Sequence, residues 1–180
     1  MFDKDSGIGH VVVGQQKVSG VGGVMTVGVF LLDVFCLGVK DAFRTQILLT
    51  QWEDLLERVF RDRKHEPLEP ACAKKLVLDA IAYARGLGLE PHADYVKASH
   101  VLTQIDASAC STTFTFGSEG KPLYIQGPYD SPVFVKRVME SLKKHAPDTG
   151  GGEKFHFIVR AEAVNPEDLS PPEEEPANGE

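Results

Sequence analysis

Two acidic residues, Asp33 and Asp41, lie within the most apolar stretch of the sequence, residues 23–43 (GVMTVGVFLLDVFCLGVKDAF). An acid inside an apolar strand costs several kcal/mol unless its carboxylate is hydrogen-bonded, paired or placed at a strand break. Together with a further acid or histidine, the two carboxylates would suit a two-metal centre on a sheet, as in ribonuclease-H-like folds. The spacing identifies no third ligand, so the simpler interpretation of Asp33 is a bulge or turn residue. A metal-dependent hydrolase or nuclease that uses Asp33 and Asp41 is therefore the alternative function.

Neither a metal site nor a cofactor site is predicted elsewhere. His92, Asp94 and His100 lie close in sequence, but Asp94 and His100 are six residues apart, whereas facing ligands on a helix are three or four apart. Asp94 is instead expected to cap a helix. The glycine-rich segments lack the spacing of dinucleotide-binding and P-loop motifs, so no cofactor is predicted.

Three cysteines, Cys36, Cys72 and Cys110, are widely spaced among apolar or helical residues. This pattern is typical of reduced, buried thiols rather than of a disulfide framework, and it favours a reducing compartment. Residues 1–10 lack the positive charge and the apolar core of a signal peptide. Residues 24–39 are too short for a membrane span and contain an acid. We therefore expect a cytoplasmic location and no membrane partner.

The net charge of −7 is concentrated at the C-terminus. Residues 161–180 contain seven acids and no Lys or Arg, and removing those seven from the total of 26 acids leaves 19 acids against 19 bases. Because this segment is rich in Pro and acidic residues and has no aromatic residue, it is expected to be a disordered tail. Residues 1–160 are expected to form one domain.

Basic residues near the end of this domain suggest binding rather than catalysis. Lys136 and Lys143 are seven residues apart, as are Arg137 and Lys144, so a helix would expose them on one face. With the preceding segment, the predicted binding residues are Lys121, Tyr124, Tyr129, Lys136, Arg137, Lys143 and Lys144. Such a surface suits an acidic segment of a partner protein or a nucleic-acid backbone. The leading hypothesis is a non-catalytic intracellular binding or regulatory module, because each candidate catalytic residue also has a structural explanation; the sequence leaves open whether the chain is an enzyme.

The elements that would position these residues follow from hydrophobic periodicity. Runs of β-branched residues predict strands at 10–18 and within 23–43, with a break or bulge near Asp33 and a third strand over 34–43. Helical spacing of apolar residues predicts helices over 48–59, 70–84 and 94–105. The order is completed by a hairpin over 114–125, a helix over 132–145 and a last strand over 155–159. The predicted fold is α+β, an antiparallel sheet built from two hairpin units with helices packed on it, in the order βββ-ααα-ββαβ.

Three segments, LLDVFCLGVKDAF, EPHADY and GKPLYIQGPYDSP, resemble a family of uncharacterised bacterial proteins. The resemblance extends over the folded part of the sequence. It implies no activity and assigns no functional residue.

Overall fold

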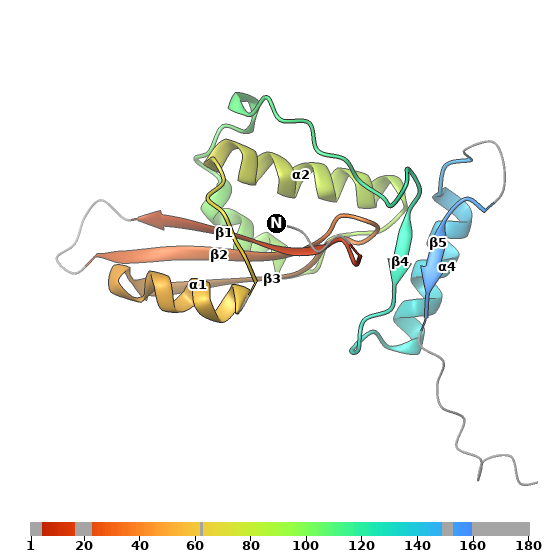
Figure 1. Cartoon of the computed structure of the whole chain (residues 1–180), viewed down its shortest axis with the longest axis horizontal. Helices are drawn as coiled ribbons and strands as arrows, with labels where there is room; N and C mark the ends of the chain where they lie inside the picture. Colours follow the sequence, from red (N-terminus) through yellow and green to blue (C-terminus); the bar gives the residue numbers. More distant parts are fainter. Residues whose placement is uncertain (1–4, 17–22, 62, 149–152, 160–180) are drawn as a thin grey trace, which may run out of the picture.

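The computed structural model describes residues 5–16, 23–61, 63–148 and 153–159. Its architecture is α+β, as predicted: a three-stranded antiparallel sheet, helices on both faces of that sheet, and a small parallel sheet near the C-terminus (Figure 1). The segment expected to form a disordered tail, residues 161–180, lies outside the described residues.

The main sheet has the order β1-β2-β3, with β1 at Ile8–Gln16, β2 at Val24–Asp33 and β3 at Gly38–Leu48. Its strands coincide with the runs of β-branched residues, whose side chains pack well on a pleated surface. Two hydrophobic faces result from the alternation along each strand. Residues such as Val11 and Phe30 face one side, and Val12 and Val29 face the other.

The predicted break near Asp33 is confirmed, but the third strand begins later than predicted. Asp33 is the last residue of β2, and residues 34–37 form a turn before Gly38 pairs back with Asp33. The Asp33 Oδ1 atom accepts hydrogen bonds from the backbone N–H groups of Phe35 and Cys36, both at 2.9 Å. Because the N–H groups of Phe35 and Cys36 donate to this carboxylate, they are not available for pairing with a neighbouring strand, and the apolar residues after Asp33 form a turn.

The two faces of the sheet are covered by different helices, α1 on one side and α2 on the other (Figure 1). Helix α1, Trp52–Phe60, packs Leu55 against Val27 and Val29, and it starts after a 3₁₀ turn at Leu49–Gln51 rather than at residue 48. Helix α2, Pro70–Gly86, covers the other face. It is joined there by α3, Tyr95–Ala98, and the 3₁₀ helix Ser99–Leu102, into which the predicted third helix is divided.

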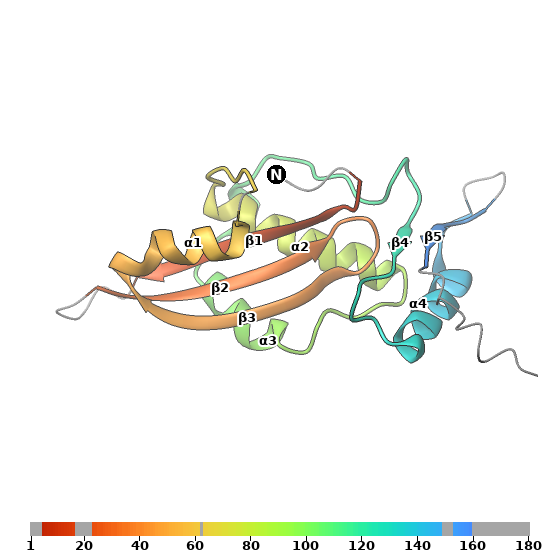
Figure 2. The same cartoon turned by 60° about the horizontal axis from the view of Figure 1, so that its bottom comes forward.

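The C-terminal part is a βαβ unit: β4 at Leu123–Ile125, α4 at Pro132–His145 and β5 at His156–Ile158. Strands β4 and β5 are parallel neighbours, and Figure 2 shows this unit at one end of the three-stranded sheet. Buried residues of the unit pack against the turn after β2 and the end of α2: Tyr124, Val138 and Leu142 contact a cluster that contains Cys36, Leu37 and Leu87.

The hairpin predicted over residues 114–125 does not form. Only Ser118 and Lys121 make a bridge across its turn, and β4 pairs with β5 instead. Phe114 and Phe116 are held by side-chain packing on the core, and the ring of Phe116 stacks on Tyr83 at a centroid distance of 5.4 Å. Their alternating pattern therefore reflects packing against α2 rather than strand pairing.

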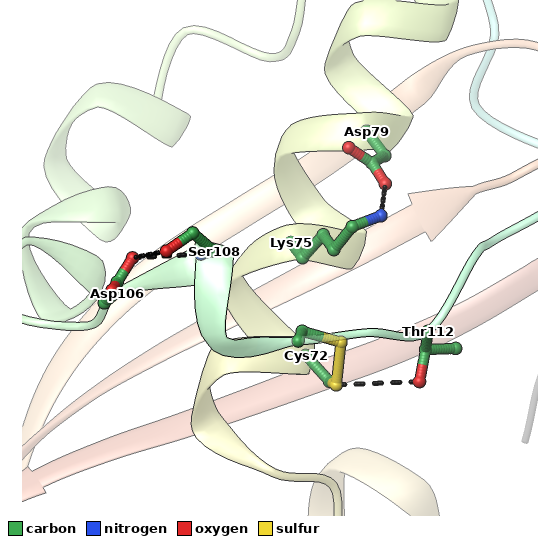
Figure 3. The surroundings of a disulfide bond; sticks show 7 residues. Cys72, Lys75, Asp79, Asp106, Ser108 and Thr112 are labelled. Carbon is green, nitrogen blue, oxygen red and sulfur yellow. Dashed lines mark hydrogen bonds and ion pairs between the residues drawn. A yellow bond between two sulfur atoms is a disulfide. The ribbon is translucent and has the colours of Figure 1, made fainter.

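Cys72 and Cys110 form a disulfide, so the prediction of three reduced thiols is wrong (Figure 3). The bond joins the first turn of α2 to the residue after the 3₁₀ helix Ala107–Ala109, with Cα atoms 5.0 Å apart. The hydroxyl of Thr112 lies 3.8 Å from the Cys72 sulfur. Of the three cysteines, Cys36 alone is a buried, free thiol as predicted. The expected cytoplasmic location rested partly on reduced cysteines, and it stays a prediction with that support removed.

None of the helices within the described ranges is both long enough and apolar enough to span a membrane.

Candidate functional site

A β-bulge places Lys40 at the centre of the candidate site. In the β2–β3 ladder Leu31 pairs with Asp41 and Leu32 pairs with Val39, so Lys40 is an extra residue on β3. A bulge re-aims the side chain at that position and commonly marks a functional region of an edge strand. Here the Lys40 side chain reaches the βαβ unit, where its Nζ atom lies 3.1 Å from Asp130 Oδ2.

Asp130 is held by three donors on one carboxylate oxygen. Besides Lys40, the Tyr124 hydroxyl donates to Oδ2 at 2.9 Å and the Gly127 N–H donates at 2.8 Å. Burial alone would raise the pKa of Asp130, but the hydrogen bonds from Gly127, Lys40 and Tyr124 outweigh it and hold the pKa below its usual value. Asp130 is therefore a fixed anion that orients Lys40.

Beside this ion pair lies a cleft of about 450 Å³, hereafter the Lys40 cleft. Its walls are the start of β3, the loop 88–93 and the first turns of α4, from which Phe134 and Arg137 contribute. The loop is fixed to the edge of β3 because the His92 N–H donates to Val39 O at 2.9 Å. Lys40, His92 and Arg137 bring basic groups to the cleft, and its acid, Glu90, is already paired with Arg85 at 3.0 Å.

Arg137 links the Lys40 cleft to the outer surface of α4. Its guanidinium lies over the Phe134 ring, 5.3 Å from the centroid, which restrains a side chain that would otherwise be flexible. Both residues line the cleft. The cleft can thus hold an anionic group by charge and a flat or apolar group against Phe134.

At the rim of the cleft, His92 lies between two carboxylates. Its Nδ1 atom is 3.7 Å from Asp41 Oδ1 and 3.8 Å from Asp94 Oδ2. Asp94 occupies the N-cap position of α3, as predicted, but its side chain accepts no capping hydrogen bond. Within the described part of the chain, no three His, Cys, Asp or Glu side chains are placed to hold a metal ion.

Asp33 and Asp41 have different environments. Asp33 is 3% exposed and accepts the hydrogen bonds of the turn at residues 34–37. The Asp41 side chain is exposed at the rim of the Lys40 cleft. Burial raises the pKa of Asp33 to about 6, and the hydrogen bonds from Cys36 and Phe35 and the charge of Lys40 oppose that rise. The interpretation of Asp33 as a turn residue matches its position. The hydrolase or nuclease hypothesis gains no support from this arrangement and stays untested.

No cysteine offers an accessible thiolate. Cys36 is buried, and burial followed by the nearby charge of Asp33 raises the pKa of its thiol. The other two cysteines are joined in the disulfide. A thiol nucleophile is therefore not available in the form described.

The predicted binding residues divide into two groups. The four cations of α4 are exposed, and Tyr129, in the loop before that helix, is 96% exposed. Tyr124 does not belong to this surface: its ring is fully buried because it packs in the core of the βαβ unit and donates to Asp130. Lys121, at the turn before β4, is partly exposed.

The α4 cations also form two stripes rather than one. Lys136 and Lys143 form one stripe. Glu140 is three or four residues from each of the four cations, so it lies between the two stripes and reduces the positive charge of both. Arg137 and Lys144 form the other stripe, which leads into the Lys40 cleft. Sequence reasoning did not single out Lys40 or Asp130; the Gly127-Pro128-Tyr129-Asp130 turn was the available signal, because an Asp side chain often accepts from a nearby backbone N–H.

Fold and site together define an α+β protein with a basic cleft between its sheet and a C-terminal βαβ unit. Comparisons with known proteins find no match, whether with protein-family profiles, curated proteins or solved structures.

Proposed function

We propose that the protein is a non-catalytic binding module that receives an acidic segment of a partner protein at the Lys40 cleft and along the Arg137–Lys144 stripe of α4. The observation that carries this proposal is the position of Arg137, which lines the cleft and also begins the exposed stripe. An acidic segment could therefore place one carboxylate in the cleft and continue along the helix.

Exposed apolar side chains beside these cations favour a protein partner over a nucleic-acid backbone. Tyr129 is 96% exposed and Val133 is 79% exposed, and Val133 lies one helical turn before Arg137. Large apolar side chains at the surface next to charged ones are typical of protein interfaces, where they supply the buried contacts. Charged neighbours then provide specificity and a faster association rate.

The candidate catalytic groups are used structurally, which is consistent with binding. The Asp33 carboxylate holds a turn, Cys36 is buried, and Lys40 is paired with Asp130. Among the described residues that line the cleft, no nucleophile, base and orienting group come together.

The test is a charge reversal along the proposed stripe. Arg137→Glu with Lys144→Glu should abolish the recovery of a protein partner from native cells, whereas wild-type recovery should weaken between low and high salt because screening acts on exposed charges. A synthetic peptide rich in Glu should bind wild type and lose affinity in the same variant. Arg58→Glu with Arg63→Glu, on the distant helix α1 and the segment after it, is the matched control with an equal charge change.

Two results would reject the proposal. One is recovery of the same partner by wild type and the Arg137/Lys144 variant. The other is equal binding of the Glu peptide and a peptide in which Gln replaces every Glu.

A further inference from the structure

A second hollow lies between α1 and the sheet face on which this helix packs. Its volume is about 740 Å³, which is within the range of small-molecule sites. The floor is formed by Val29, Phe43, Thr45 and Ile47, and the wall by Leu55 and Arg58 of α1. We call it the arginine groove.

Positive charge dominates the arginine groove. Arg58, Arg61 and Arg63 line it, and no acid belongs to its lining within the described residues. These three arginines form no ion pair with a carboxylate of the described part of the chain; Asp62, between two of them in sequence, lies outside it. The Arg58 Nε–H group donates to the backbone carbonyl of Asp54 at 3.2 Å, and its other N–H groups remain for a ligand. Arg44 also touches the groove, but its guanidinium reaches His100, at 3.1 Å.

The positive charge of Arg63 also affects the pKa of His10. Burial lowers this pKa most, the charge of Arg63 lowers it further, and the charge of Asp41, at the rim of the Lys40 cleft, raises it. His10 lies on the groove lining, so the charge of Arg63 acts on the interior of the groove and not only on solvent. An anion in the groove would therefore lie near the positive charge of Arg63.

Aromatic surface accompanies this charge. Phe43 on the edge strand β3 is 45% exposed, and it lines the groove. Phe60 closes the end of the groove, where one ring face stacks on His65 at a centroid distance of 4.5 Å. The open flat surface is therefore that of Phe43.

The backbone at Arg61 is strained at the same place. Arg61 follows the last residue of α1 with φ 51° and ψ −128°, a conformation that glycine adopts readily and other residues rarely do. Glycine would adopt this backbone conformation without strain, but the position is occupied by an arginine that lines the groove.

We propose that the arginine groove binds a nucleotide, with its phosphate on the guanidinium groups of Arg58, Arg61 and Arg63 and its base against Phe43. Guanidinium groups match phosphate oxygens with paired donors, and aromatic rings stack on bases without requiring one particular base. An acidic peptide would use the arginines but would leave the exposed Phe43 ring without a stacking partner. This site is separate from the Lys40 cleft and does not depend on its function.

The nucleotide can come from two sources, a free nucleotide or one unit of a single-stranded nucleic acid. Calorimetric titration of the full chain should therefore use ATP without divalent ions, inorganic tripolyphosphate, adenosine and an eight-nucleotide single-stranded RNA. ATP or the RNA should bind more tightly than both tripolyphosphate and adenosine. The tighter of the two identifies the source.

Variants test the individual contacts. Arg58→Gln with Arg63→Gln should weaken nucleotide binding by roughly tenfold for each lost charged contact. Phe43→Leu should weaken ATP or RNA binding and leave tripolyphosphate unchanged. Arg61→Gly should raise the melting temperature while it lowers nucleotide affinity, a combination that general loss of folding cannot produce.

Lys136→Gln with Lys143→Gln, on α4 and away from α1, is the matched control and should bind nucleotide as wild type does (Figure 1). The proposal is overturned if no nucleotide binds, if tripolyphosphate binds as tightly as ATP and the RNA, or if the control loses as much affinity as the Arg58/Arg63 variant. An unaltered affinity in the Arg58/Arg63 variant would also overturn it, whatever the result for the acidic partner at the Lys40 cleft.

Discussion

Lys40 lies 3.1 Å from Asp130 although 90 positions separate them in the sequence. The pair joins the bulge of β3 to the loop that enters α4, and its side chains are 20% and 9% exposed. A charge pair with this little solvent contact is strongly affected by the removal of one partner, because the other charge is left buried and unpaired.

Asp130→Ala should lower the free energy of unfolding by about 2–4 kcal/mol, because it leaves Lys40, Tyr124 and the Gly127 N–H without their acceptor. Urea denaturation measures the change. Since hydrogen bonding lowers the pKa of Asp130, its stabilising contribution is present above the usual pKa and is lost as the pH falls through the folded-state value. Asp79→Ala is the control: it removes the partner of Lys75 on the surface of α2 and should change stability by about 0.5 kcal/mol or less. Equal effects of the two substitutions would contradict the assigned role of Asp130.

Asp33→Asn should stabilise the protein more at pH 7 than at pH 4. Burial raises the pKa of Asp33 from 3.8 to about 6, so the native state favours the protonated form. The stability associated with that proton is fully present below the usual pKa and is lost as the pH rises through 6, by about 3 kcal/mol in total. Asparagine keeps an oxygen that accepts from Phe35 and Cys36 but has no charge. Denaturation at several pH values checks this, and a constant difference between variant and wild type would refute it.

Removal of the disulfide should destabilise the chain. The bond closes a loop between residues that are 38 positions apart, and loop-closure entropy predicts a loss of about 3–4 kcal/mol in Cys72→Ser with Cys110→Ser. Alkylation of the denatured wild type without reductant should modify one cysteine, Cys36, and with reductant three. A reductant should lower the melting temperature of wild type and leave that of the double variant unchanged. Alkylation of all three cysteines before reduction would show that the bond is absent.

Gly38→Ala should be strongly destabilising. Gly38 has φ 67°, and an added Cβ would lie 2.7 Å from Ala80 O and 2.8 Å from Ala84 Cβ, so β3 could no longer pass close to α2. The expected loss is about 2–4 kcal/mol. Gly86→Ala is the matched control, because nothing lies within 4 Å of its added Cβ, and it should be neutral or stabilising by up to about 1 kcal/mol. Thermal denaturation of both variants gives the comparison, and a tolerated alanine at 38 would mean that strand and helix are further apart than described.

Local chemistry predicted most of the elements. Pro70 in the first turn of α2 matches the prediction, and so does the start of α4, where Ser131 Oγ accepts from the Phe134 N–H at 3.2 Å before Pro132 takes the first helical position. The break at Asp33 was also predictable, because a buried acid in an apolar run needs hydrogen-bond donors, and turn N–H groups supply them.

Long-range partners were not predictable from the same patterns. Strands β4 and β5 have three residues each and pair in parallel across α4, and such short segments carry no periodicity that identifies a partner. The cysteine spacing did not reveal the disulfide, because the residues meet only after the chain returns past α2. For the candidate site, Arg137 was identified from helical spacing, whereas Lys40 depends on a bulge whose position is set by pairing with β2.

The turn at residues 34–37 has a consequence for synthesis on the ribosome. Val34 O accepts from the Gly117 N–H, and Phe35 O accepts from the Leu123 N–H and the Tyr83 hydroxyl. Those backbone donors are translated more than about 80 residues after the turn, so a nascent chain can pair β1, β2 and β3 early, since neighbours in sequence are neighbours in the sheet. The Val34 carbonyl group then remains hydrated until residue 117 emerges, and the Phe35 carbonyl group has the Tyr83 hydroxyl but lacks its backbone donor until residue 123 emerges. We therefore expect the last step of folding to be the packing of residues 117–123 against the turn at residues 34–37.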